Sequence, residues 1–279
     1  MRDIYKWLYG KRGRAALGAP APLVPDVLQP FVAAINRTML PVMGAGFDHD
    51  AAAVATGSRL GGRPWWPKGD PYPLDQDGKP LYLLIQINFD EMPRFSPFPE
   101  TGLLQLFIGG DPLFGANLDD PTRPAGFRAI YHSSLDRPHE AKAGVRSVAK
   151  SAHLPLEHPL NPIGLAFEAD QMPVDPSDYR FAQLLPEIAG DEDLVEAYAD
   201  WLVSDLAPSA IRLGGYPTFT QDDPRGSMPN GSLGDLALLT LDSTNGLMWG
   251  DAGAAQFLMH EQDLLRRDFS KVVYNWDCY

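Results

Sequence analysis

The chain has 279 residues, 44% apolar and 21% charged, so its composition is that of an ordinary globular protein and excludes wholesale disorder. Its 23 basic and 36 acidic side chains give a net charge of −13, which argues against nucleic acid as a main partner because phosphate binding requires a basic surface. No stretch approaches the roughly 18 uninterrupted apolar residues of a membrane-spanning helix, so we expect no membrane partner. The single cysteine, Cys278, excludes internal disulfides and is typical of the reducing cytoplasm.

Residues 1–50 predict a helical N-terminal arm, which precedes a single domain over residues 51–279. A short helix is expected within the arm at residues 25–36. Five basic side chains occur among the first 14 residues, but no apolar stretch of a secretory signal follows them. We therefore interpret the arm as a solvated or packed helix.

Three strands are predicted in the first half of the domain, over residues 81–90, 102–108 and 127–132. In the first of them, the odd positions from Leu83 to Phe89 share one face, and the even positions share the other. Both faces are largely apolar, so we expect this strand in the centre of a sheet that is covered on two sides.

The connection over residues 136–210 is expected to be irregular at first and helical at its end. Residues 138–178 contain eight prolines or glycines in no clear period, which is typical of an ordered but irregular segment. Residues 191–206 place apolar side chains at helical spacing after an acidic first turn, and Pro208 ends the predicted helix.

The second half is expected to hold strands over residues 236–241, 254–259 and 271–279, with a short helix at residues 261–268. The 27 prolines and 26 glycines are spread along the whole chain and favour short strands separated by turns over long helices. The predicted fold class is therefore α+β, with mainly antiparallel sheets and few helices.

Three blocks of sequence recur in the same order with nearly one offset, which predicts an internal duplication. The motif RLGGRP that begins at Arg59 returns as RLGGYP at Arg212. The strand blocks that begin at residues 83 and 102 return at residues 237 and 253. We expect two similar halves, about residues 58–135 and 211–279, related by a pseudo-twofold axis.

The second half contains three distinctive segments, IRLGGYPTFTQDD, LALLTLDS and LMWGDAGAAQFLMHEQDLLRRDFSKVVYNWDCY. They resemble the YwqG-like family, a bacterial domain of unknown function, and the first-half segments RLGGRPWWP and LYLLIQINFDEMP are similar to the N-terminal half of that family. The resemblance covers roughly residues 55–279 and departs from the family pattern at Thr240, where the family tends to place Gln. It implies a cytoplasmic α+β protein and brings no established reaction.

The two loops that follow Arg59 and Arg212 are the first candidate binding feature. Paired glycines permit a tight or left-handed turn, and the later proline fixes the direction in which the chain leaves it. One interpretation is a turn that the fold needs twice. The other is an anion cradle made of glycine N–H groups and the guanidinium, in which case two cradles would face a shared cleft.

Trp249 and Asp251 lie between two predicted strands and form the second candidate feature. One interpretation is a hairpin turn in which Asp251 bonds its own backbone. The other is a recognition site, because a large ring with an N–H donor beside a carboxylate in a loop suits sugars, amines or peptides.

The function predicted from these features is a cytoplasmic, non-enzymatic module that binds a small molecule or a protein where the two halves meet. Its site residues would be Arg59, Arg212, Trp249 and Asp251. No cofactor or metal is expected, since the six histidines form no zinc motif and the acidic residues lack the spacing of a calcium loop. The alternative is a hydrolase or transferase that uses two carboxylates or a divalent metal.

Overall fold

The chain folds around one ten-stranded sheet in the computed structural model. The structure describes residues 23–48, 54–117, 119–123, 126–140, 144–145, 147–228, 231–244 and 246–279. The strands are β1 (Leu40–Phe47), β2 (Arg59–Leu60), β3 (Tyr82–Asn88), β4 (Leu103–Ile108), β5 (Phe127–His132), β6 (Ile163–Met172), β7 (Ile211–Gly214), β8 (Leu236–Asp242), β9 (Ala254–Met259) and β10 (Val273–Asp277). They are ordered β10-β9-β8-β7-β1-β6-β2-β3-β4-β5, and every pairing is antiparallel. This arrangement confirms the expected fold class, sheet-rich α+β with antiparallel strands.

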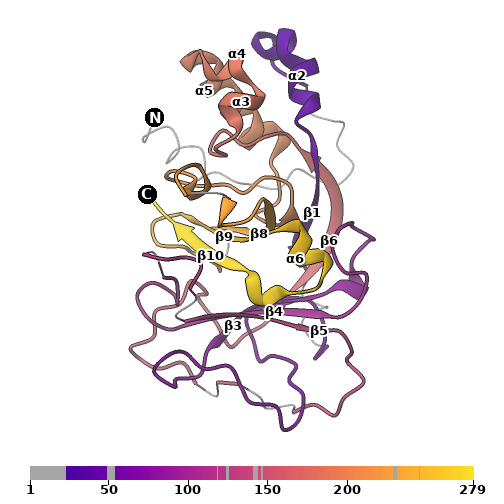
Figure 1. Ribbon diagram of the computed structural model, residues 1–279, viewed down its shortest axis with the longest axis vertical. Coiled ribbons are helices and arrows are strands. Elements are labelled where there is room, and N and C mark those ends of the chain that lie inside the picture. Colours follow the sequence, from indigo (N-terminus) through magenta and orange to yellow (C-terminus); the bar gives the residue numbers. More distant parts are fainter. Residues whose placement is uncertain are drawn as a thin grey trace.

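Helices are short, and most of them gather at one end of the molecule, beyond the sheet (Figure 1). The α-helices are α2 (Val32–Arg37), α3 (Phe181–Leu184), α4 (Pro186–Ala189), α5 (Glu192–Trp201) and α6 (Glu261–Leu265). The 3-10 and π helices are η1 (Asp26–Phe31), η3 (Phe89–Glu91), η4 (Leu202–Leu206), η5 (Pro224–Gly226) and η7 (Phe269–Lys271). None of these described helices is long and apolar enough to cross a membrane.

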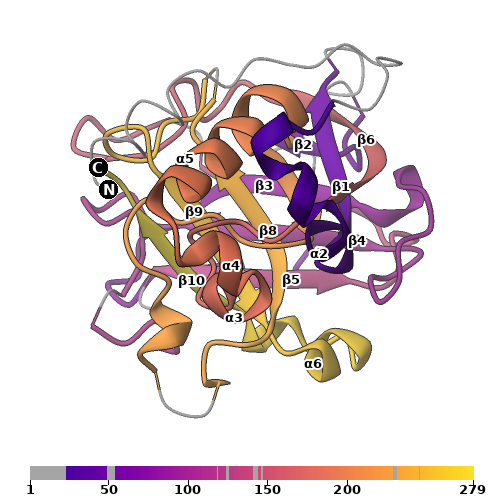
Figure 2. The same ribbon diagram turned by 90° about the horizontal axis from the view of Figure 1, so that it is seen from above.

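The sheet curves into a near-barrel, so that β3 to β5 face β8 to β10 (Figure 1; seen from above in Figure 2). The two end strands, β5 and β10, approach each other through aromatic side chains. The ring of Phe127 on β5 lies 5.0 Å from that of Tyr274 on β10 and 5.5 Å from that of Phe257 on the neighbouring strand β9, measured between centroids. Aromatic packing rather than strand pairing therefore brings the two ends of the sheet together.

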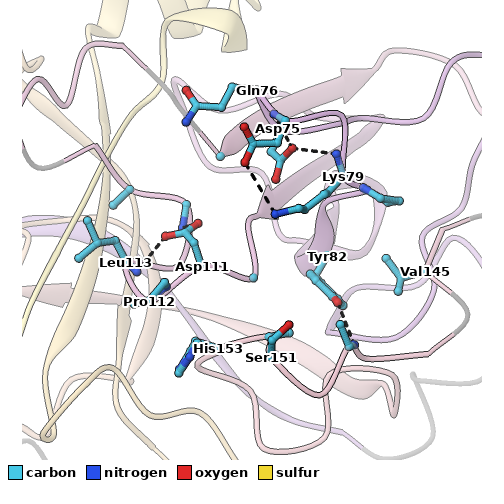
Figure 3. A pocket seen from close by; sticks show the side chains of 18 of the residues that line it. Asp75, Gln76, Lys79, Tyr82, Asp111, Pro112, Leu113, Val145, Ser151 and His153 are labelled. Atoms are coloured by element: carbon cyan, nitrogen blue, oxygen red, sulfur yellow. Dashed lines mark hydrogen bonds and ion pairs between the residues drawn. The ribbon is translucent and has the colours of Figure 1, made fainter.

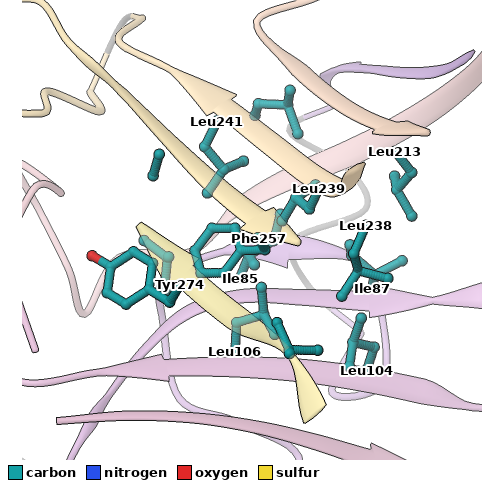
Figure 4. Packing of buried hydrophobic residues seen from close by; sticks show 14 of the residues in the cluster. Ile85, Ile87, Leu104, Leu106, Leu213, Leu238, Leu239, Leu241, Phe257 and Tyr274 are labelled. Carbon is teal, nitrogen blue, oxygen red and sulfur yellow. The ribbon is translucent and has the colours of Figure 1, made fainter. Parts of the chain in front are cut away.

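The main core fills the space between these two parts of the sheet (Figure 4). Its members share full burial and an inward-facing position on their strands. They include Ile85, Ile87, Leu104 and Leu106 on one side and Leu239, Leu241, Phe257 and Tyr274 on the other. Each such side chain stabilises the fold by roughly 1.5–3 kcal/mol through its removal from water. All seven residues of β3 are buried, which confirms the prediction of a strand covered on both faces.

Corresponding strand pairings occur on the two sides of the central strands β1 and β6. Arg59 on β2 pairs with Gln86 on β3, and Arg212 on β7 pairs with Thr240 on β8. The pairs β3–β4 and β8–β9 each carry a register irregularity near the start of the first strand. Because successive side chains point to opposite faces of a strand, both arginines point away from the main core, which contains their neighbours in sequence.

Two central strands, β1 and β6, differ from the expectation based on sequence. Residues 40–47 form β1 where a helical arm was expected, and β6 lies within the segment 138–178 that was expected to be irregular. The glycines of β1 obscure its alternation, and they serve packing: a Cβ on Gly44 would lie 2.4 Å from the Ser209 hydroxyl. Residues 1–22, 49 and 50 of the expected arm lie outside the described residues.

The predicted helices are confirmed at residues 25–36, 191–206 and 261–268 by η1 with α2, by α5 with η4, and by α6. The carboxylate of Asp191 accepts hydrogen bonds from the N–H groups of the second and third residues after it, which caps the start of α5. The apolar face of α5 then packs Tyr198 and Trp201 into a second core, formed by the helices together with β1 and β6.

A buried ionic network joins these helices to the segment that precedes β8. The carboxylate of Asp178 lies 2.7 Å from a guanidinium nitrogen of Arg180 and 2.7 Å from one of Arg225. Asp223 also pairs with Arg225, at 2.6 Å. Burial by itself would raise the pKa of Asp178, but hydrogen bonds and charges from the two arginines outweigh it and hold that pKa below its usual range.

This depressed pKa predicts acid sensitivity. A carboxylate with a lowered folded-state pKa contributes stability above its unfolded-state pKa, and this stability is lost as the pH falls through the folded-state pKa. We expect Asp178→Asn to lower the free energy of unfolding at pH 7 by about 2 kcal/mol, because Asp223 still neutralises Arg225 and the amide keeps one oxygen acceptor. Urea unfolding at pH 7 and again under acidic conditions would measure both effects.

The variant should also lose less stability than the wild type on acidification. The matched control is Asp119→Asn at an exposed position, which should unfold like the wild type at both pH values. An Asp178→Asn variant that loses as much stability in acid as the wild type would contradict this assignment.

Candidate functional site

A cavity with a volume of about 810 Å³ opens on the side of the first half (Figure 3). Three loop segments supply most of its lining, within residues 75–82, 110–116 and 145–153. Its walls carry carboxylates, one ammonium, hydroxyls and an imidazole. The labelled polar members are Asp75, Gln76, Lys79, Tyr82, Asp111, Ser151 and His153 (Figure 3).

One wall of the cavity is a turn organised by Asp75. A single oxygen of its carboxylate accepts hydrogen bonds from the backbone N–H groups of Asp77, at 2.9 Å, and Lys79, at 2.8 Å. This is the side-chain-to-backbone arrangement through which aspartate stabilises turns. The turn brings the carboxylate of Asp77 within 3.7 Å of the Lys79 ammonium, and both side chains are largely exposed, so this pair adds little to stability.

The opposite wall is a second turn, organised by Asp111. Its two carboxylate oxygens accept hydrogen bonds from the N–H groups of Leu113 and Gly115, at 2.9 and 2.8 Å. Figure 3 shows the Lys79 side chain reaching into the cavity between the Asp75 turn and Asp111. Each wall is therefore held in shape by its own carboxylate.

Phe114 fastens this second wall to the other half of the molecule. Its backbone has a φ of 54°, in the left-handed region that a bulky side chain rarely adopts, at a cost of roughly 1–2 kcal/mol. The conformation places its ring 5.7 Å from that of Trp249 and 4.8 Å from that of Trp276. The neighbouring carbonyl of Leu113 accepts a 2.8 Å hydrogen bond from the Trp276 indole. The shape of the cavity thus depends on packing against the second half.

Tyr274 provides a further anchor behind the same wall. Its hydroxyl donates a hydrogen bond to the Phe114 carbonyl at 3.3 Å. Burial raises the pKa of Tyr274 well above its ordinary value, and the negative charge of Asp111 raises it further. The phenol therefore stays protonated and keeps its hydrogen on this carbonyl across the physiological pH range.

The charges that line the cavity favour a cation. Asp75, Asp77 and Asp111 supply three negative charges against the single positive charge of Lys79, so the lining is net negative. Hydroxyl groups such as those of Tyr82 and Ser151 add hydrogen-bonding capacity. Among the described residues, no group of three or more His, Cys, Asp or Glu side chains is placed to hold a metal ion.

The arginines predicted from the repeated loop lie elsewhere, on separate strands with β6 and β1 between them. Arg59 is 4% exposed and donates to the backbone carbonyls of residues 54, 55 and 63. Arg212 is fully buried, lies 2.5 Å from the carboxylate of Asp242 and donates to the Thr218 hydroxyl. The glycines of both loops have positive φ values between 59° and 78°, which bears out the predicted turns.

Trp249 and Asp251 occupy different environments although only one residue separates them. Trp249 is fully buried in the main core, whereas Asp251 is exposed in the turn between β8 and β9. The carbonyl of Asp251 accepts a hydrogen bond from the N–H group of Tyr279 at 3.4 Å. The structure therefore does not bring the four predicted side chains to one surface, but it places Trp249 directly behind the Phe114 wall of the cavity.

The residues that line the cavity were not predicted from the sequence, because most of them lie in loops that show no regular spacing of apolar residues. Two local signals are present: the Asp75-to-Gly78 turn, and the pair of glycines immediately before Asp111. Both indicate tight turns. Neither indicates that the two turns face each other, because that depends on the pairing of β3 with β4.

Comparison with known proteins identifies the family to which this chain belongs. No protein with a curated description matches the sequence. A family model does match residues 58–278, a span that begins just before β2 and leaves out the central strand β1. Because this match covers most of the chain, the protein belongs to the family described as a domain of unknown function, DUF1963.

Proposed function

We propose that this protein is a non-enzymatic binding module whose acidic cavity takes a cationic ligand, such as a polyamine or the basic side chain of a peptide. The observation that carries the proposal is the net negative lining of a cavity of about 810 Å³. This volume lies within the range of about 300–1,000 Å³ that is typical of ligand pockets. The charged and hydroxyl-bearing side chains among the lining suit a ligand with polar groups rather than a wholly apolar one.

The position of the cavity is consistent with a site beside the junction of the two halves. Its lining comes from residues 75–153, and the second half supports it from behind through Trp249, Trp276 and Tyr274. Within this proposal Trp249 is a supporting residue. Asp251 does not line the cavity and is retained as a separate candidate contact to be tested. We assign Arg212 a structural role, which is to stabilise the glycine loop that follows it.

The same proposal includes the origin and location of the protein. We attribute the corresponding pairings of Arg59 with Gln86 and of Arg212 with Thr240 to duplication of an ancestral unit. We assign the chain to the YwqG-like group on the residues of its glycine loops and its C-terminal segment. A cytoplasmic location follows from the single thiol, which is typical of reducing compartments.

Asp77 and Lys79 provide a test in which two substitutions have opposite effects. The carboxylates of Asp75 and Asp111 hold turns in shape through hydrogen bonds from backbone N–H groups, so replacing either would also disturb the walls. The carboxylate of Asp77 has no such role, so its charge can be removed with the turn in place. We expect Asp77→Asn to weaken the binding of spermidine about three- to tenfold, and Lys79→Met to strengthen it by a similar factor, since one changes the local charge by +1 and the other by −1. Isothermal titration calorimetry at constant ionic strength would measure both affinities.

Glu192→Gln is the matched control because it removes one negative charge at an exposed position on α5, away from the lining. Its affinity for spermidine should equal that of the wild type. A separate variant, Asp251→Ala, would test whether Asp251 contacts the ligand. Equal affinities for Asp77→Asn, Lys79→Met and the wild type would refute the cavity as the binding site. Stabilisation by Mg²⁺ or Mn²⁺ that disappears in Asp77→Asn would instead favour the carboxylate- or metal-dependent enzyme.

A further inference from the structure

Arg59 is a buried cation whose hydrogen-bond partners are all uncharged. It is 4% exposed, and its terminal nitrogens donate to three backbone carbonyls at 2.6, 2.9 and 2.6 Å. Its Nε atom is buried without a hydrogen-bond partner. Buried charges in proteins are normally paired with an opposite charge, because carbonyl dipoles replace only part of the lost hydration.

The corresponding arginine in the other half does have an acidic partner. Arg212 pairs with Thr240 across β7 and β8 and forms its ion pair with Asp242, two residues further along β8. Arg59 pairs with Gln86 across β2 and β3, and the residue two positions further along β3 is Asn88. The first half thus has a neutral amide at the position where the second half has a carboxylate.

The cavity beside Arg59 is much larger than the one beside Asp242. A cavity of about 280 Å³ is lined by Arg59, Arg63, Trp65 and His139, together with Glu140 and apolar residues. The cavity beside Asp242 measures only about 10 Å³, no more than a single water molecule requires. Open space therefore adjoins Arg59, which has no carboxylate partner among the described residues, whereas Arg212 lines neither of these two cavities.

Other charges near Arg59 do not remove this imbalance. Burial lowers the pKa of the Arg59 guanidinium, and Glu91 raises it by a smaller amount from outside ion-pair distance. The carboxylate of Glu91 is engaged with the N–H group of Ser58, at 2.8 Å. An arginine side chain remains protonated in spite of such shifts. In the cavity, the charge of Glu140 is offset by that of Arg63, so the charge of Arg59 is left over.

We propose that the cavity beside Arg59 binds a small anionic group, a carboxylate or a phosphate, which supplies the negative charge that Asp242 supplies internally in the second half. Arg63 and His139 line the same space and offer further N–H donors, and the buried ring of Trp65 forms its apolar wall. This site shares no lining residue with the acidic cavity and takes a ligand of opposite charge. Each of the two proposals can therefore be tested, and refuted, independently of the other.

Asn88→Asp is the decisive variant because it restores the missing carboxylate at the corresponding position. The substitution is nearly isosteric, and an aspartate oxygen still accepts the hydrogen bond that Asn88 receives from the N–H group of Asp90. The probes are inorganic phosphate and acetate, each titrated into wild type and variant at constant ionic strength and followed by calorimetry. We expect the wild type to bind at least one of the two anions and Asn88→Asp to bind it at least about tenfold more weakly, with an unchanged or raised Tm.

Arg63→Gln serves as a second variant that leaves Arg59 and its backbone partners in place. It should weaken binding of the same anion about threefold without a loss of thermal stability, since the Arg63 side chain is half-buried and only its carbonyl holds Arg59. Stronger binding of phosphate than of acetate would identify a phosphorylated ligand, and the reverse would identify a carboxylate. Failure of both anions to bind the wild type, or equal binding by wild type and Asn88→Asp, would overturn the proposal.

Discussion

Replacing Asp242 by asparagine is expected to lower the free energy of unfolding by about 3–5 kcal/mol, because it leaves the guanidinium of Arg212 buried without its carboxylate. The side chain of Arg212 is fully buried, and that of Asp242 is only 6% exposed. The adjoining space of about 10 Å³ cannot admit a replacement anion with its hydration. Chemical denaturation followed by tryptophan fluorescence would measure the loss.

A double variant separates the value of the ion pair from the penalty of removing only one of its two charges. Arg212→Met combined with Asp242→Asn removes both charges, and we expect it to be more stable than Asp242→Asn alone, because a buried pair can often be replaced by neutral groups at small cost. Arg212 also donates to the carbonyl of Ser209, which would lose this partner, so recovery should be partial. A double variant that is less stable than either single variant would contradict the assignment of the loss to the broken ion pair.

Replacing Trp249 by alanine is expected to lower the free energy of unfolding by about 3–5 kcal/mol and the Tm by about 10 °C. The indole is fully buried and lies against Phe114, Tyr274 and Trp276, with ring centroids 5.7 to 6.3 Å apart. Its removal leaves a cavity that the surrounding sheet cannot collapse to fill. Because the Phe114 wall would lose its support, spermidine binding should weaken as well, and differential scanning calorimetry with titration would record both effects.

Trp249→Phe is the matched control because it keeps an aromatic ring in contact with Phe114. It should cost about half as much stability and preserve most of the spermidine affinity. If Trp249→Ala weakened binding while leaving the Tm unchanged, Trp249 would be a direct ligand contact rather than a support of the wall.

The longer strands of the two flanking parts of the sheet were predictable from sequence. The two central strands were not, and neither were the short strands β2 and β7, which form where loops were expected. Residues 82–88 form a nearly continuous apolar run because β3 is buried on both faces, and such a pattern is visible without any knowledge of neighbours. β1 contains Gly44 and Gly46, and β6 is largely exposed over its polar half, so neither shows a strong period. Their place at the centre of the sheet depends on long-range pairing, which local sequence does not encode.

The loops after Arg59 and Arg212 illustrate the same division for the candidate sites. Their sequences determined the positive φ values, because only glycine adopts them without strain. They also determined that each arginine would stand beside a turn. Only the tertiary structure decided that one guanidinium meets the carboxylate of Asp242 and the other meets backbone carbonyls beside an open cavity. The difference arises on the paired strand, at Asn88 and Asp242, far from the loops themselves.

What the sequence by itself determined was the fold class, most of the elements and the two glycine turns, since each of these follows from local pattern and backbone chemistry. The acidic cavity was decided by tertiary structure alone. Asp75 and Asp111 each organise a local turn that the sequence could suggest, but they face each other only because β3 and β4 pair and because Phe114 packs on Trp249. Burial and charge balance are properties of neighbours in space, and residues far apart in the chain become neighbours only when the sheet has formed.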